Sequence, residues 1–63
     1  MHQNLLTTPK AAEYLGLSRN TLNRWRWDGR GPRYLKLGSA VRYRQSDLDA
    51  FIEAAERNHT TVA

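Results

Sequence analysis

Apolar residues recur at helical spacing in three short stretches of the chain, and before the last of these they alternate with polar residues. The Thr-Pro pair at 8–9 predicts a helix start, because threonine is a common N-cap and proline is tolerated at the first helical position. Gly16 predicts the end of this helix. Ser18 is a suitable N-cap for a second helix, which we expect to stop near Trp27, before the turn-forming residues 28–32.

Residues 34–37 and 41–44 each alternate between apolar and mostly basic side chains, and the connection 38–40 contains a glycine. This pattern predicts a β-hairpin. With residues 38–40 as the connection, one face of the hairpin is expected to carry Leu35, Leu37, Val41 and Tyr43. The opposite face is then expected to carry Lys36, Arg42 and Arg44.

We expect a third helix to begin at Ser46, with the serine as its N-cap and two carboxylates in its first turn, where they favour the helix dipole. An apolar stripe at the spacing i, i+3, i+4, i+7 follows, formed by Leu48, Phe51, Ile52 and Ala55. Residues 58–63 are mostly polar and are expected to fray. The order helix, helix, hairpin, helix predicts a mainly α fold with a small β-hairpin, in a single domain 1–63 whose ordered part spans about 5–57.

The length and composition limit the function classes. A chain of 63 residues holds at most one domain and buries only about 60% of the surface that its unfolded form exposes. The lack of cysteine excludes disulfides and thiol chemistry, and is compatible with a reducing cytosol. We find neither the ~18-residue apolar run of a membrane span nor a basic segment followed by an apolar stretch at the start. A cytoplasmic protein without a membrane partner is therefore expected.

The titratable residues do not form a catalytic or metal-binding pattern. Asp47 and Asp49, two residues apart, look like a carboxylate pair, but their place at a helix start explains them. His2 and His59 lie in the two polar termini, without the spacing of metal ligands. We predict that the chain is not an enzyme, and that it uses no cofactor and no metal.

Positive charge is concentrated in the middle of the chain. From Arg19 to Arg44 there are eight basic residues and one acid, whereas the rest of the chain has two basic and five acidic residues. Seven of the eight are arginine, whose planar fork pairs with phosphate and with the edge of guanine. One basic and one mildly acidic part favour binding of a polyanion on a single face, because solvated surfaces usually mix the two signs.

The small and apolar residues of the first two helices have the spacing of a helix-turn-helix unit, whose second helix enters the major groove of DNA. Ala12 falls where the first helix must let the second approach closely, and Gly16 makes the turn four residues later. The other buried positions of the motif are occupied by Ala11, Leu15, Leu17, Leu22 and Trp25.

Residues 5–56 resemble the MerR-like winged helix-turn-helix group, in particular the small excisionase and AlpA-like proteins of phages and mobile elements. The resemblance is carried by Leu6-Thr7-Thr8-Pro9, Ala11-Ala12, Leu15-Gly16-Leu17-Ser18, Thr21-Leu22, Arg24-Trp25, Gly38, Val41-Arg42-Tyr43-Arg44 and Ser46-Asp47-Leu48. It implies that the second helix reads the major groove and that the hairpin is a wing on the adjacent backbone or minor groove.

The resemblance also implies a role. Excisionases bend attachment-site DNA and bias an integrase toward excision, and many also regulate promoters. The expected partners are therefore double-stranded DNA, further copies of the chain on adjacent sites, and an integrase or recombinase. Longer MerR regulators have a coiled-coil dimerisation helix and an effector domain, which this sequence does not show, so we expect a monomer that binds cooperatively and senses no ligand.

The residues that face DNA follow from a helical wheel. With Leu22 and Trp25 buried, the opposite direction of the second helix holds Asn20, Asn23, Arg24 and Trp27. Asparagine can pair with adenine and arginine with guanine, and Arg19 at the helix start can contact bases or phosphate. Arg26 lies nearer the buried side, where phosphate or an acidic neighbour is in reach. Trp27 can touch thymine methyls or sugar, but packing on the wing is the favoured alternative.

In the wing, the residues expected to contact DNA are Lys36, Ser39, Arg42 and Arg44. A tip formed by glycine and serine can approach the DNA backbone closely, and arginine is favoured in a narrow minor groove. The alternative for the two arginines is an ion pair with an acid of the third helix, and this alternative is stronger for Arg44 than for Arg42.

Two other functions fit the sequence less well than DNA binding does. A protein-interaction adaptor with a degenerate winged helix is expected to have lost the arginines of the wing and the polar residues of the second helix, and both are present. Binding of single-stranded RNA usually needs exposed aromatic residues on a sheet, whereas Tyr43 is expected on the inner face. Sequence-specific binding of double-stranded DNA is therefore the leading hypothesis.

Overall fold

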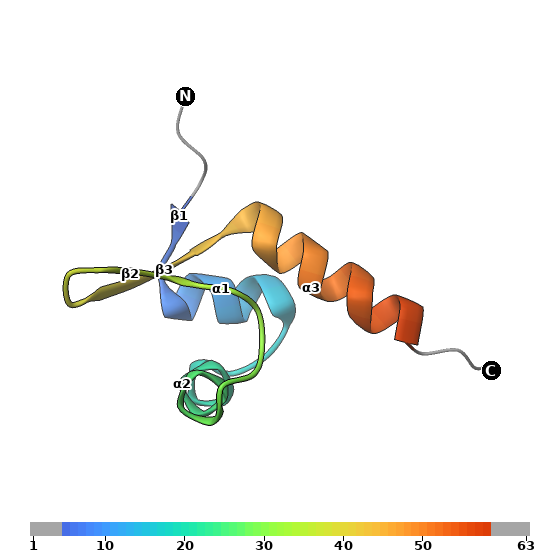
Figure 1. Cartoon of the computed structure of the whole chain (residues 1–63), viewed down its shortest axis with the longest axis horizontal. Helices are drawn as coiled ribbons and strands as arrows, with labels where there is room; N and C mark the ends of the chain where they lie inside the picture. The colour runs from blue at the N-terminus through green and yellow to red at the C-terminus, as the bar shows by residue number, and fades with distance from the viewer. Residues whose placement is uncertain (1–4, 59–63) are drawn as a thin grey trace.

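A computed structural model describes residues 5–58, except for the side chains of residues 57 and 58 (Figure 1). The predictions for residues 1–4 and 59–63, the two histidines included, lie outside this range. The elements, in order, are β1 (Leu5–Leu6), α1 (Thr8–Leu15), α2 (Arg19–Asp28), β2 (Leu35–Leu37), β3 (Ala40–Arg44) and α3 (Gln45–Asn58). The predicted winged helix-turn-helix is confirmed, with β2 and β3 as the wing. None of the helices at 5–58 is long and apolar enough to cross a membrane.

The helix ends largely follow the predicted capping residues. Ser18 caps α2 by accepting a hydrogen bond from the backbone N–H of Thr21, and Gly16 and Gly29 close α1 and α2. The cap of α1 is Thr7, one residue before the predicted Thr-Pro pair. The predicted cap of the third helix is wrong, because β3 runs directly into α3 at Gln45 and places Ser46 inside the first turn.

The predicted faces of the hairpin are wrong. Leu37 pairs with Ala40, so the connection has two residues rather than three, and Leu35 pairs with Arg42 and Lys36 with Val41. Residues opposite each other on antiparallel strands project to the same face. Because the connection is one residue shorter than expected, each side chain of β2 lies on the same face as the β3 side chains that were expected on the opposite face. Lys36 therefore shares a face with Val41 and Tyr43, and Leu35 and Leu37 share the other face with Arg42 and Arg44.

The sheet has a third strand that sequence reasoning did not identify. β1 pairs antiparallel with β3, so that the strand order is β1-β3-β2. Leu6 lies opposite Tyr43 on the inner face, whereas Leu5, opposite Arg44, is 45% exposed. Through β1 the segment before α1 is fixed to the root of the wing.

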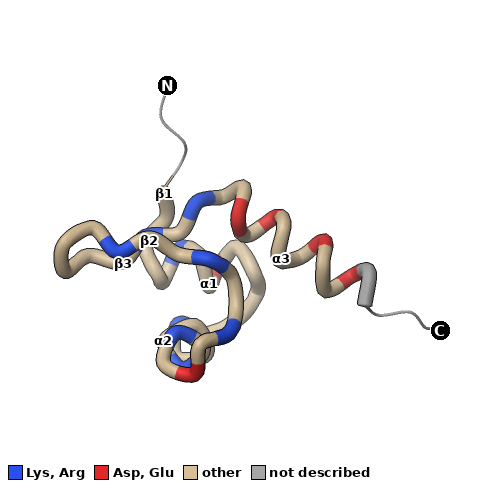
Figure 2. The backbone as a smooth tube through the Cα atoms, viewed as in Figure 1, with Lys and Arg blue, Asp and Glu red and all other residues tan. Residues whose placement is uncertain are grey.

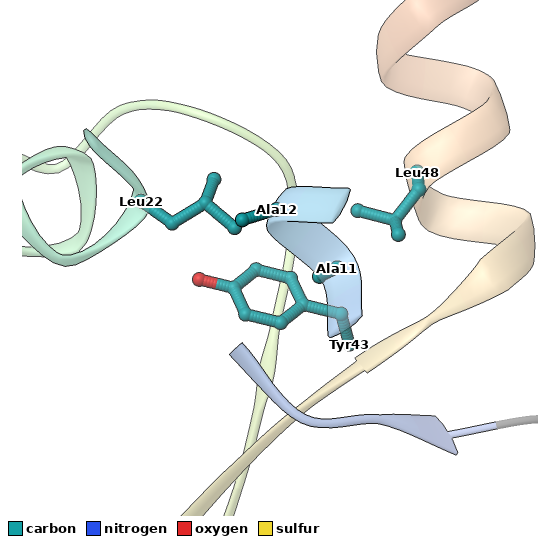
Figure 3. Packing of buried hydrophobic residues seen from close by; sticks show 5 residues of the cluster. All are labelled: Ala11, Ala12, Leu22, Tyr43 and Leu48. Atoms are coloured by element: carbon teal, nitrogen blue, oxygen red, sulfur yellow. The ribbon is translucent and has the colours of Figure 1, made fainter. Parts of the chain in front are cut away.

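The core lies between the sheet and the three helices (Figure 3). Its fully buried members are Ala11, Ala12, Leu22, Tyr43 and Leu48. The alanines let Leu22 of α2 and Leu48 of α3 approach α1 from two sides, while the hydroxyl of Tyr43 points toward α2 (Figure 3). Half-buried Leu6, Leu15, Trp25 and Val41 border this cluster.

Three apolar residues expected in the core are exposed. Leu17, in the turn between α1 and α2, is 39% exposed, and Ile52 on α3 is 41% exposed. Ala55 is exposed as well. The second half of α3 extends beyond the end of α1 (Figure 1), so its apolar stripe continues past the elements that could cover it.

In addition to the packing of Leu48, an aromatic contact and a hydrogen bond connect the first half of α3 to α2 and α1. The ring of Phe51 packs against that of Trp25 on α2, with centroids 5.6 Å apart. The hydroxyl of Tyr14 on α1 donates a hydrogen bond to Oδ1 of Asp49. This hydrogen bond raises the pKa of Tyr14 above its usual value, with smaller contributions from desolvation and from the charge of Asp49.

Candidate nucleic-acid interface

One side of α2 is free of contacts with the core. Leu22 is fully buried and Trp25 half-buried, so the residues on the other side of the helix face solvent. This outward face consists of Asn20, Asn23, Arg24 and Trp27, all of which are exposed. Arg19, the first residue of α2, is exposed too. The structure thus brings together the five α2 residues that were predicted to contact DNA.

The indole of Trp27 is 90% exposed and does not pack on the wing. The favoured alternative of the sequence analysis is therefore wrong. That alternative assumed that the helix ends before Trp27, but α2 continues to Asp28. As a helical residue, Trp27 follows Asn23 and Arg24 by one turn and stays on the outward face.

Arg26 is half-buried on the side of α2 that faces the sheet. Its guanidinium contacts uncharged side chains rather than the expected acidic neighbour. Its Nη1 donates to the hydroxyl of Tyr43 at 2.9 Å and to Oγ1 of Thr8 at 3.4 Å. Its Nη2 donates to Oδ1 of Asn23 at 2.7 Å. The guanidinium carbon also lies 5.7 Å from the ring centroid of Tyr34. These contacts link α2 to α1, to β3 and to the segment before β2.

The segment after α2 adds basic residues that the predicted site did not include. The backbone N–H of Arg30 donates to the carbonyl of Trp25 at 2.8 Å, which folds the chain back along the helix. As a result, the exposed side chain of Arg30 helps to line a hollow of about 230 Å³ together with Asn20, Thr21, Arg24 and Trp25. The signal for this was the glycine directly after the helix, which predicts such a reversal.

A second hollow borders the same segment. Its volume is about 290 Å³. It is lined by Arg26, Gly29, Arg30, Gly31, Pro32, Arg33 and Tyr34. The hollow therefore has three guanidinium groups around it, and Arg30 belongs to both hollows.

The basic residues of the wing are divided between its two faces. Lys36 and Ser39 are exposed, and Lys36 shares its face with Tyr43, whose hydroxyl contacts α2 through Arg26. Arg42 is half-buried on the opposite face, and its Nη1 donates to the carbonyl of Val41 at 2.8 Å. The wing residue on the α2 side of the sheet is therefore Lys36.

Arg44 adopts the ion pair that the sequence analysis left as an alternative. Its Nε lies 3.6 Å from Oδ2 of Asp47, and its side chain is 38% exposed. The Nε atom is buried and has no hydrogen-bond partner among the described residues. Arg44 thus joins the end of β3 to the first turn of α3.

The two signs of charge lie mostly on different parts of the domain. Figure 2 shows acidic residues spaced along α3, and basic residues on α2, on the segment that follows it and on the sheet. The acid on α2 is Asp28, whose Oδ2 lies 3.8 Å from Nη2 of Arg30. The four acids of α3 are Asp47, Asp49, Glu53 and Glu56. A polyanion that approaches α2 and the wing would meet mostly positive side chains.

A comparison with protein families finds a match that covers most of the chain. Residues 5–56 match the sequence profile of a family described as a helix-turn-helix domain, and this range includes every described element apart from the last two residues of α3. Among curated proteins no match was found.

Proposed function

Because the chain belongs to this helix-turn-helix domain family, which comprises small excisionase- and AlpA-like DNA-binding proteins rather than enzymes, we propose that it binds double-stranded DNA sequence-specifically. In this proposal α2 enters the major groove and the β2–β3 wing lies on the adjacent backbone or minor groove. The outward face of α2 carries the argument: its four residues are exposed, polar or aromatic, and flanked by Arg19 and Arg30.

We propose different DNA contacts for the exposed residues of α2. Arg24 has a guanidinium that can donate to O6 and N7 of guanine, and Asn20 and Asn23 have amides that can pair with adenine. Arg19 lies in the first turn and contacts a base or a phosphate. Trp27 contacts a sugar or a thymine methyl, because an indole that is 90% exposed has no role in the core.

The wing is proposed to hold the DNA backbone. Lys36 and Ser39 are exposed at or near the tip and lie best for this role. Arg42 and Arg44, on the opposite face, are proposed to contribute through the parts of their side chains that remain exposed. To these residues we add Arg30, because it borders the hollow that Asn20 and Arg24 also line.

The biological role that we propose is that of an excisionase-like directionality factor or of a local transcription regulator. A single recognition helix with one wing buries an interface on the order of 600–1,000 Å², which is small for specific binding. Several copies on neighbouring sites are therefore proposed to bind cooperatively, with an integrase or recombinase as a further partner in the excisionase case. Mapping the bound sites in cells separates the two roles, since they differ in where the sites lie.

Selection from a random duplex library, followed by titration of the selected duplex at several salt concentrations, tests the proposal. If about five phosphates are neutralised, log K should fall with log salt with a slope of about −4 to −5. Lys36→Ala should lower this slope by about 1. Lys10→Ala is the matched control, because it removes one exposed positive charge from α1 rather than from the wing. The proposal fails if no sequence is enriched, or if the slope for duplex DNA is near zero.

A further inference from the structure

Arg26 is the one described arginine whose guanidinium contacts side chains from four separate segments: α1, α2, the segment before β2, and β3. It lies half-buried, and its closest hydrogen bonds, to Asn23 and Tyr43, are 2.7 and 2.9 Å long. Tyr43 in turn is 1% exposed, and its ring is part of the core. A guanidinium held in this way has little freedom to move toward DNA.

This arrangement determines the orientation of the Asn23 amide. A guanidinium has only donors, so the atom of Asn23 that meets it must be the oxygen, Oδ1. The amide nitrogen, Nδ2, then points away from Arg26. Without such a partner, the amide of an exposed asparagine can rotate by half a turn about the Cβ–Cγ bond, which exchanges the positions of its donor Nδ2 and its acceptor Oδ1.

We propose that Arg26 is a positioning residue: it fixes the Asn23 amide with Nδ2 directed outward, so that Asn23 recognises adenine rather than the other bases. The inference rests on the proposed function. To recognise adenine in the major groove, a side chain needs one group that donates a hydrogen bond to N7 and one group that accepts a hydrogen bond from the N6 amino group. Nδ2 provides the donor. Oδ1 provides the acceptor, since a carbonyl oxygen has two lone pairs and Arg26 occupies one of them.

The role differs from that of a phosphate contact, which is the other use of an arginine near DNA. A phosphate contact weakens good and poor sites alike and contributes about 1 to the salt slope. A positioning residue instead changes the preference at one base pair and leaves the salt slope unchanged. The two roles therefore predict different measurements for the same variant.

The experiment is a double-mutant cycle of Arg26→Lys and Asn23→Ala, measured on the selected duplex and on its single-base variants. Lysine keeps the charge, but it cannot reach Asn23, Tyr43 and Thr8 together because it lacks the planar fork. In the Asn23 background, Arg26→Lys should reduce the preference for adenine at one position by about three- to tenfold, the usual size of coupling between contacting residues. In the Asn23→Ala background, Arg26→Lys should leave the base preferences unchanged.

Tyr43→Phe provides a second variant. It removes the hydroxyl that holds Nη1 and keeps both Arg26 and Asn23, so a smaller loss of preference at the same base is expected. Melting curves of all variants identify the temperature at which each is folded, and binding is measured below it. A loss of affinity for Arg26→Lys that is equal on the selected duplex and on all its single-base variants would overturn the inference in favour of a phosphate contact. The same change of preference in both Asn23 backgrounds would overturn it as well. Both results differ from a failure of the proposed function, in which the unaltered protein would not select a duplex at all.

Discussion

Gly31 should be the glycine of this domain that tolerates alanine least. A methyl group added to Gly31 would lie 2.8 Å from Cε3 and 3.0 Å from Cβ of Trp25, and the φ angle of Gly31 is +92°. The indole is also in contact with Phe51, with a centroid distance of 5.6 Å, so a shift of the indole would disturb this second contact. Gly31→Ala therefore combines an unfavourable backbone angle with overpacking of the residue that joins α2 to α3.

The loss of stability in Gly31→Ala is the sum of these two contributions. A non-glycine residue in a sparsely populated backbone region costs about 1–3 kcal/mol, and overpacking costs about 1–3 kcal/mol more. Gly29→Ala is the matched control: its φ angle is +76°, but nothing lies within 4 Å of the added methyl group, so only the backbone part applies. A folded chain of 63 residues has a stability of about 3–9 kcal/mol in all. Gly31→Ala should thus remove a large fraction of it.

The assay is thermal and guanidinium unfolding of the two variants and the unaltered protein. The expected difference of about 1–3 kcal/mol between the variants corresponds to a melting temperature that is lower by at least about 4 °C for Gly31→Ala. A Trp27→Phe background leaves Trp25 as the only indole, so that its fluorescence reports directly on the contact. Equal stabilities of Gly31→Ala and Gly29→Ala would refute the close approach of Gly31 to Trp25.

Three further predictions concern the surface. The raised pKa of Tyr14 means that its neutral form is favoured in the folded state, so this contribution to stability is present below the usual pKa of 10.0 and is lost as the pH rises through the folded pKa. Melting curves recorded from about pH 8 to about pH 12 should show a loss of stability as the pH rises, and Tyr14→Phe and Asp49→Asn should both make this loss smaller. Trp27→Ala should change stability by no more than about 0.5 kcal/mol but weaken DNA binding, and a clear loss of stability would contradict its exposed position. Arg24→Ala should cost about 1–3 kcal/mol on the best site and relax one base preference, whereas Lys36→Ala should lower the salt slope by about 1; an exchange of these effects would invert the two roles.

The helices could be predicted because their signals are local. Ser18, Gly16 and the spacing of Leu22 and Trp25 act within one or two turns, and the structure has both helices close to the predicted bounds. The pairing of β1 with β3 had no such signal, because a strand of two residues shows no periodicity. The exposure of Ile52 could not be predicted either, because an apolar stripe on one helix gives no information about the length of the elements that pack against it.

The register of the wing depended on a single residue. Ala40 fits a turn and a strand about equally well from its type, and its inclusion in β3 shortens the connection to two residues. Side chains alternate between the two faces along a strand, so a change of one residue in the length of the connection changes which side chains share a face. In the structure Lys36 therefore lies on the face of Tyr43 rather than on the face of Arg42. The contacts of Arg26 were likewise not predictable, because its partners Thr8 and Tyr43 are far away in sequence.

The inner side of α2 should therefore influence DNA recognition in addition to the outward face. Leu22, Trp25 and Arg26 lie at i, i+3 and i+4, and they connect the helix to α1, α3 and β3 respectively. The residues proposed to contact bases project from the same backbone on the other side, so any rotation or shift of α2 moves all of them together. Base contacts require hydrogen-bond distances of about 2.7–3.2 Å, which a shift of 1 Å is enough to break. A substitution at Trp25 or Gly31 that leaves the domain folded is thus expected to reduce specificity, although neither residue lies on the outward face.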